Sequence, residues 1–140
     1  MDLETTATQA PQAADDWWGE PIYTYTRAQA LEDGAQVAIP EEESAAAGFS
    51  VPVYLTRGVW DQYVEVPEGV RLQDSMGRLW DILHMAHLAG RTCVGPLCEV
   101  VVWVRNDNRR PRQRKLLMEI GAVDMDDARP AITIMLPEDL

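Results

Sequence analysis

The sequence predicts a single α+β domain, with helices in the N-terminal half and a three-stranded antiparallel β-meander in the C-terminal half. Two observations predict this class. Capped helical segments follow one another up to residue 90, and apolar runs separated by turn-forming residues follow after it. The chain of 140 residues has the length of one domain and can bury a core of its own.

The first residues differ in composition from the rest. Residues 1–19 contain no Lys or Arg and are rich in Ala, Thr, Gln, Pro and Asp, which predicts a disordered acidic tail before a domain at 20–140. Trp17 and Trp18 interrupt this composition. They either fold back onto the domain or anchor a partner.

Three short helices are expected in the N-terminal half. Thr26 with Gln29 has the spacing of a capping box. A second helix follows Pro40 and a third begins at Thr56, where a side-chain hydroxyl can cap its first turn. Short extended segments are expected between them, at 22–25, 36–39 and 51–55.

The longest helix is predicted at 75–89, with Gly90 as its end. Its residues are apolar on nearly all sides, and Arg78 and Asp81 are the clear exceptions. Such a helix is buried on both sides or keeps one face for a partner. We therefore expect self-association, as a homodimer through helix 75–89, or a partner on this face.

The strands of the meander are expected at 100–104, 112–120 and 131–136. The first is a continuous apolar run, which is typical of a central strand covered on both faces. The second alternates between apolar and polar residues. Residues 121–130 are acidic and rich in turn formers, so a loop is expected there.

Charge is distributed unevenly along the chain. The net charge is −11, yet residues 105–115 carry +5, which leaves −16 on the remainder. The basic residues of this stretch are Arg105, Arg109, Arg110, Arg112, Arg114 and Lys115. They form a solvated hairpin tip, bind phosphate or an acidic protein surface, or pair with acids of the domain itself.

The acidic remainder favours a different class of partner, namely the basic surface of a protein that normally holds nucleic acid. The residues expected to contribute to this acidic surface are Glu41, Glu42, Glu43, Asp124, Asp126 and Asp127.

One candidate metal site consists of His84, His87, Cys93 and Cys98, since histidines three residues apart share a helix face. The spacing matches no standard zinc pattern, and a hydrogen-bonded core histidine is the alternative for His87. Asp81 could orient His84 as a base, but no nucleophile motif accompanies them. We expect no cofactor, no metal and no enzymatic activity.

No apolar run approaches the ~20 residues of a membrane span, so no membrane partner is expected. Two cysteines are too few for a disulfide scaffold, which favours reduced thiols and a cytosolic setting.

Four segments resemble a family of small proteins of unknown function found in phages, plasmids and integrated elements of bacteria. They are residues 22–34, 77–83, 104–107 and 132–137, and the resemblance covers roughly residues 21–140. The resemblance implies a setting, mobile DNA in the bacterial cytoplasm, and supplies no catalytic residues.

Three functions follow as hypotheses. The first is an acidic interaction protein of a mobile element that binds or inhibits a basic, nucleic-acid-binding host protein, such as a defence complex. The second is a nucleic-acid-binding accessory protein that uses the arginine-rich hairpin 105–115. The third, which has the least support, is a metal-dependent enzyme.

Overall fold

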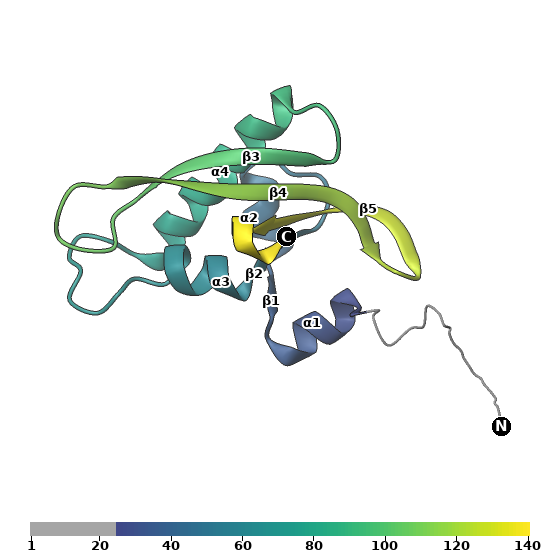
Figure 1. The fold of residues 1–140 in the computed structure, drawn as a ribbon, viewed down its shortest axis with the longest axis horizontal. Coiled ribbons are helices and arrows are strands. Elements are labelled where there is room, and N and C mark those ends of the chain that lie inside the picture. The colour runs from purple at the N-terminus through teal and green to yellow at the C-terminus, as the bar shows by residue number, and fades with distance from the viewer. Residues whose placement is uncertain (1–24) are drawn as a thin grey trace. The chain divides into compact units, whose positions relative to one another are not determined.

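A five-stranded mixed sheet organises the structure, with the strand order β1-β2-β5-β4-β3 (Figure 1). The structure is a computed structural model and describes residues 25–140. The strands are β1 (Gln36–Ala38), β2 (Val53–Thr56), β3 (Leu97–Val104), β4 (Arg112–Asp124) and β5 (Asp127–Met135). β2 and β5 run parallel, whereas the other neighbouring pairs are antiparallel.

The helices are α1 (Arg27–Asp33), α2 (Glu41–Ala46), α3 (Arg57–Val59) and α4 (Ser75–Thr92), with a π-helical segment η2 (Trp60–Val64) and a 3₁₀ turn η3 (Pro137–Asp139). The capping box at the start of α1 is confirmed, since the Thr26 hydroxyl accepts the Gln29 N–H at 3.1 Å. The chain divides into two compact units, 1–30 and 31–140, and the whole sheet belongs to the second.

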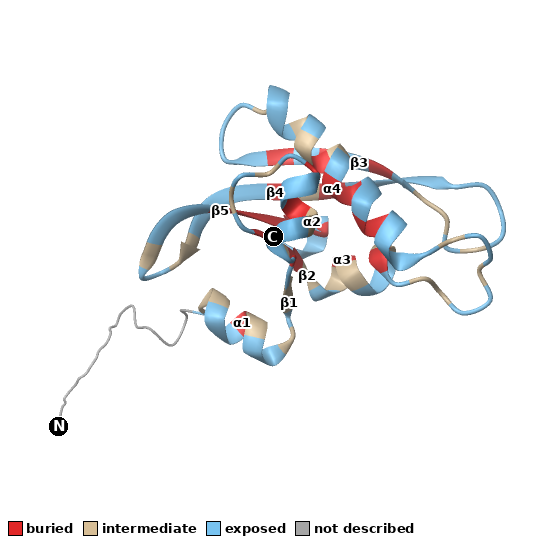
Figure 2. Cartoon of the chain, turned by 180° about the vertical axis from the view of Figure 1, so that it is seen from behind, coloured by how far each residue is buried: buried red, intermediate tan, exposed pale blue. Residues whose placement is uncertain are grey.

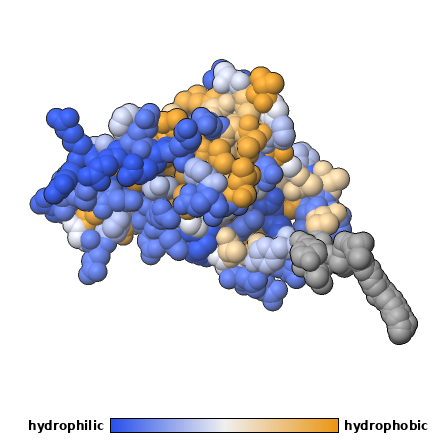
Figure 3. Space-filling model, in the orientation of Figure 1, coloured by the Kyte–Doolittle hydropathy of each residue, from blue (hydrophilic) through white to orange (hydrophobic). Residues whose placement is uncertain are grey.

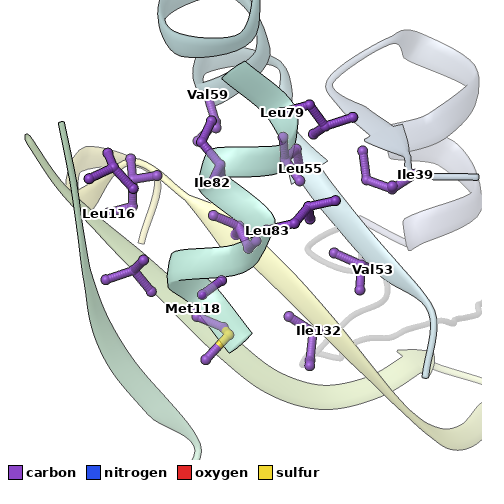
Figure 4. Close-up of a cluster of buried hydrophobic side chains, with 14 of the residues drawn as sticks. Ile39, Val53, Leu55, Val59, Leu79, Ile82, Leu83, Leu116, Met118 and Ile132 are labelled. Carbon is purple, nitrogen blue, oxygen red and sulfur yellow. The ribbon is translucent and has the colours of Figure 1, made fainter. Parts of the chain in front are cut away.

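The core lies between α4 and one face of the sheet. Leu79, Ile82 and Leu83 are buried on the side of α4 that faces the strands (Figures 2 and 4). They pack in one cluster with strand residues such as Leu55 and Met118. The opposite sheet face, which Figure 1 views from the front, is not covered by α4.

The predicted three-stranded meander is wrong as a description of the sheet. β3, β4 and β5 do pair antiparallel in chain order, but β1 and β2 from the N-terminal half join the same sheet. β5 is buried on both faces, as is typical of an interior strand, and its second edge pairs with β2 from Val53 to Leu55. The helices are likewise not confined to the N-terminal half, because α4 extends to Thr92.

The prediction that residues 100–104 form the central strand is also wrong. β3 lies at one edge of the sheet, and β5 lies in its interior. Val100 and Val102 are buried beneath α4, whereas Val101 and Trp103 remain 36% and 63% exposed on the other face. A continuous apolar run predicts a strand that is covered on both faces, but residues 25–140 cover β3 on one face only.

Two element boundaries also differ from expectation. Helix α4 continues past Gly90, where a side-chain carbon would lie 3.3 Å from the Met118 methyl group. Gly90 therefore allows α4 to pack closely against β4, and it does not end the helix. The expected loop at 121–130 is instead a continuation of β4 and β5 around a tight turn at Met125 and Asp126.

Some expectations lie outside the described residues, namely the disordered tail at 1–19, the Trp17–Trp18 pair and most of the segment 22–25. Among residues 25–140, none of the helices combines the length and the apolar character that crossing a membrane requires.

Candidate functional site

The arginine-rich loop between β3 and β4 is anchored by Arg78, a residue of α4 that is only 7% exposed. Its guanidinium donates to the backbone oxygens of Tyr63 and Arg105, both at 2.9 Å, and to Asn106 Oδ1 at 2.6 Å. Burial lowers the pKa of Arg78. All the acceptors of its guanidinium N–H groups are neutral oxygens, and none is a carboxylate. Arg78 therefore joins α4, η2 and the loop.

The same loop is bonded to residues 69–71. Asn108 accepts the Arg71 N–H at 2.9 Å and donates to the Gly69 oxygen at 3.0 Å. Arg105 donates to the Arg71 oxygen and to the Asp107 oxygen. The Arg105 guanidinium is thus used inside the molecule, by oxygens of the backbone and of Asn108 rather than by an acidic side chain.

Two cations of β4, the strand that follows the loop, pair with acids of the domain. Arg112 lies 3.1 Å from Asp107, and Lys115 lies 3.3 Å from Glu99. The pKa of Asp107 is lowered, first by the hydrogen bond from the Arg109 backbone N–H and then by Arg112. Both ion pairs are solvent-exposed, so each contributes little to stability.

Arg109 and Arg110 stand apart from these paired cations. Within residues 25–140 neither guanidinium makes a hydrogen bond or an ion pair, and both residues are exposed. Arg114 is exposed and donates to the Gln113 oxygen of its own strand at 3.0 Å. Of the six predicted basic site residues, Arg109 and Arg110 are thus the pair that is most available to an anion.

The predicted acidic residues fall into two separate sets. Glu41, Glu42 and Glu43 form the first turn of α2, where the helix dipole favours negative charge. They have no cationic partner among the described residues, and Glu43 Oε1 is buried without a hydrogen bond.

The second acidic set lies at the tip of the β4–β5 hairpin, which Figures 1 and 2 both place away from α2. Asp127 binds Arg129 with a closest N–O distance of 2.5 Å, and this pairing lowers the pKa of Asp127 to about 2. Asp124 accepts the Met125 N–H at 2.8 Å. Asp124, Asp126 and Asp127 therefore do not share a surface with the α2 set.

The two histidines point to different surroundings. His84 stacks on Trp80 with ring centroids 5.8 Å apart on the exposed side of α4, whereas His87 packs edge-on against Phe49 at 5.4 Å. No group of three or more His, Cys, Asp or Glu residues within 25–140 is arranged to hold a metal.

The cysteines differ from the expectation of reduced thiols. Cys93 and Cys98 are joined by a disulfide, and their Cα atoms lie 5.8 Å apart, which is an ordinary distance for a disulfide. The bond links the end of α4 to the beginning of β3.

Two hollows follow the free edge of β3, where it faces α4. One, of about 170 Å³, lies near the Arg78 end and includes Asp81, Val102 and Trp103. The other, of about 480 Å³, lies near the disulfide end and includes Leu88, Leu97 and Val101. A third hollow of about 400 Å³ lies beside α2 and includes Glu41 and Phe49.

Sequence reasoning missed Arg78 and the edge of β3. One signal for Arg78 was present, because it stands four residues before Ile82 and eight before Ala86 on the buried side of α4. An arginine at such a position needs acceptors, and the Asn-rich turn at 106–108 supplies one of them.

The fold and these surfaces describe a small α+β protein with a mixed sheet and one long helix across it. The model of a family of unknown function, DUF6573, matches residues 18–140, and the chain belongs to this family. Neither the curated proteins nor the solved structures contain a match to the chain.

Proposed function

We propose that this chain is a non-enzymatic interaction protein that uses the acidic first turn of α2 to bind a basic, nucleic-acid-binding protein. Its setting would be a mobile genetic element in the bacterial cytoplasm, and its target a host protein such as a defence complex. The supporting observation is the contrast in pairing. Glu41–Glu43 have no cationic partner in residues 25–140, while Arg105 of the loop and Arg112 and Lys115 of β4 are bound within the molecule.

The geometry beside α2 supports the same proposal. The hollow of about 400 Å³ is lined by Glu41 and by the apolar residues Phe49 and Val51. A lysine or arginine of a partner could lay its aliphatic stem on these apolar residues and its charge on the carboxylates.

The test is affinity capture from bacterial lysate, with and without nuclease treatment, and identification of the partners by mass spectrometry. Glu41→Lys with Glu42→Lys reverses the exposed charges and leaves the half-buried Glu43 in place. Arg109→Gln with Arg110→Gln is the matched control, because it changes two exposed charges on another surface. We expect basic partners that are lost with the Glu variants and with salt, and retained with the Arg variants.

Two results would count against the proposal. One is capture that is unchanged in the Glu41→Lys, Glu42→Lys protein. The other is capture that disappears with nuclease, because such partners would be held by nucleic acid rather than by the acidic turn.

A second candidate function rests on Arg109 and Arg110, which are unpaired within residues 25–140 and can contact phosphate. Under this hypothesis the protein binds a labelled single-stranded or double-stranded oligonucleotide at low salt. Charge reversal by Arg109→Glu with Arg110→Glu would abolish binding, and the salt slope would correspond to about two phosphate contacts. A lack of binding at about 50 mM salt would exclude this function.

A further inference from the structure

The free edge of β3 lacks the features that usually protect a sheet edge. The strand spans eight residues, Leu97–Val104, and contains no proline, no lysine and one charged residue, Glu99. Natural proteins protect such edges with charges, prolines, bulges or a covering segment, because unpaired backbone groups recruit another strand. No backbone segment of residues 25–140 pairs with this side of β3.

The pairing of β3 with β4 shows which backbone groups face the free edge. The Ile120 N–H donates to the Pro96 oxygen at 2.7 Å, which makes these two residues a hydrogen-bonded pair of the antiparallel ladder. Pairs alternate along such a ladder, so even-numbered residues of β3 bond to β4. The N–H and C=O groups of four residues therefore point to the free edge: Leu97, Glu99, Val101 and Trp103.

The side chains of the same four residues lie on the sheet face that α4 leaves open. Leu97, Val101 and Trp103 are 40%, 36% and 63% exposed. Figure 3 looks onto this face and shows apolar surface gathered over β3 and the adjoining part of β4. Apolar side chains and unpaired backbone groups thus coincide on one strand.

The strand is also held rigidly in this exposed position. The Cys93–Cys98 disulfide links its beginning to the end of α4, and Arg78 binds the Arg105 oxygen just beyond its other end. A strand that is held in place at both ends loses little conformational entropy when another strand binds.

We propose that β3 pairs with β3 of a second copy of this chain, antiparallel and about a two-fold axis at Val100, to form a continuous ten-stranded sheet. In this register the pairs across the interface are Leu97 with Trp103 of the second copy and Glu99 with Val101. All four outward-facing residues of each copy then form their backbone hydrogen bonds.

The residues of β3 explain why a second copy fits this edge and why the axis lies at Val100. If all eight residues Leu97–Val104 of the two copies overlapped, each odd-numbered residue would pair with an even-numbered one. The buried face of one strand would then lie on the same side as the open face of the other. An axis at Val101 would leave Leu97 opposite Arg105, beyond the end of the strand. An axis at Glu99 would place two carboxylates opposite each other, which is unfavourable.

Charge also fits this register. Glu99 is the one charge on the strand, and Lys115 of the same chain neutralises it at 3.3 Å. The two copies still repel each other at long range, because each carries a net charge of −11. Salt screens this repulsion, so dimerisation should strengthen as ionic strength rises.

The test measures the dimerisation constant of the full chain by sedimentation equilibrium, with two opposite charges at one exposed position. Val101→Glu places a carboxylate beside Glu99 of the second copy, twice per dimer, whereas Val101→Lys places an ammonium group there. Residue 101 also lies opposite Lys115 on β4 of its own chain. This contact is present in both monomer and dimer, so it does not change the dissociation constant. We expect the dissociation constant of Val101→Glu to be about tenfold or more above that of Val101→Lys.

Two further measurements identify the interface. The amides of Leu97, Glu99, Val101 and Trp103 should become protected from hydrogen exchange as the protein concentration rises. Trp103→Ala should weaken the dimer about tenfold or more, because tryptophan carries a large share of interface energy. Trp80→Gln is the matched control, since Trp80 is an exposed tryptophan on α4, 45% accessible, and should leave the constant unchanged.

The proposal is overturned if the wild-type chain stays monomeric at millimolar concentration. It is also overturned by a dimer in which these four amides remain unprotected, in which the two Val101 variants dissociate equally, or which Trp80→Gln disrupts. The last result would assign the interface to the outer face of α4.

Discussion

β5 and β3 have similar apolar sequences, but β5 lies inside the sheet and β3 lies at its edge. Residues 131–136 and 100–104 are both apolar runs, and either could be the centre of a sheet. In the structure β5 lies between β2 and β4, and every residue from Ala131 to Leu136 is buried. β3 lies at the edge and buries alternate residues only.

The two strands are also held in different ways. β5 is fixed by hydrogen bonds to a strand on either side, whereas β3 has one neighbouring strand and two additional links to α4, the disulfide and Arg78. An apolar run therefore predicts that a strand is buried, but it does not specify which part of the protein, or which other chain, buries it. For β5 the cover is intramolecular, and for β3 we have proposed a second copy.

The largest effect should come from truncation of a buried side chain of β5, compared with truncation of a side chain on the open face of β3. Ile134→Ala on β5 removes a fully buried side chain and should cost about 4 kcal/mol of unfolding free energy. Val101→Ala on β3 should cost less than about 1 kcal/mol in the monomer. Denaturant unfolding at low protein concentration measures both values, and equal losses would remove the contrast between the strands.

Loss of the Arg78 anchor should come next. Arg78→Leu leaves the oxygens of Tyr63, Arg105 and Asn106 without their donor, at a total cost of about 3 kcal/mol. Arg91→Leu replaces an exposed arginine on the same helix and should stay within about 0.5 kcal/mol of wild type. If the two variants unfold at the same denaturant concentration, Arg78 does not hold the end of β3.

The disulfide should contribute less, because it closes a short loop. Cys93→Ala with Cys98→Ala should cost about 2 kcal/mol, and reduction of the wild-type protein should cost a similar amount. Thermal unfolding with and without reductant measures the effect, and the double variant should not respond to reductant. A wild-type protein that is equally insensitive would show that the bond does not stabilise β3.

The smallest effect should be a pH dependence at the tip of the β4–β5 hairpin. The pKa of Asp127 is lowered to about 2 by Arg129, so its contribution to stability is present above the unfolded pKa near 3.8 and is lost as the pH falls towards 2. Asp127→Asn should therefore be less stable than wild type at pH 5, and the difference should vanish near pH 2. Unfolding curves from pH 5 to pH 2 test this, and a constant difference would exclude the linkage.

Local structure was predictable from particular residues, because its causes are short in range. The Thr26–Gln29 capping box and the Thr56 cap are seen, with the Thr56 hydroxyl 3.5 Å from the Val59 N–H. The basic loop was also located correctly by its composition. Which of its arginines are free was not predictable, because one acceptor of Arg105, the Arg71 oxygen, lies 34 residues away in the sequence.

The sequence by itself determined the α+β class, the helix starts and the uneven distribution of charge, because these depend on composition and on neighbours within a turn or two. Only the tertiary structure decided the strand order, the pairing of Cys93 with Cys98, the anchoring by Arg78 and the edge position of β3. Pairing between distant strands depends on which apolar faces meet in three dimensions, and an apolar run has the same pattern at the centre of a sheet as at its edge.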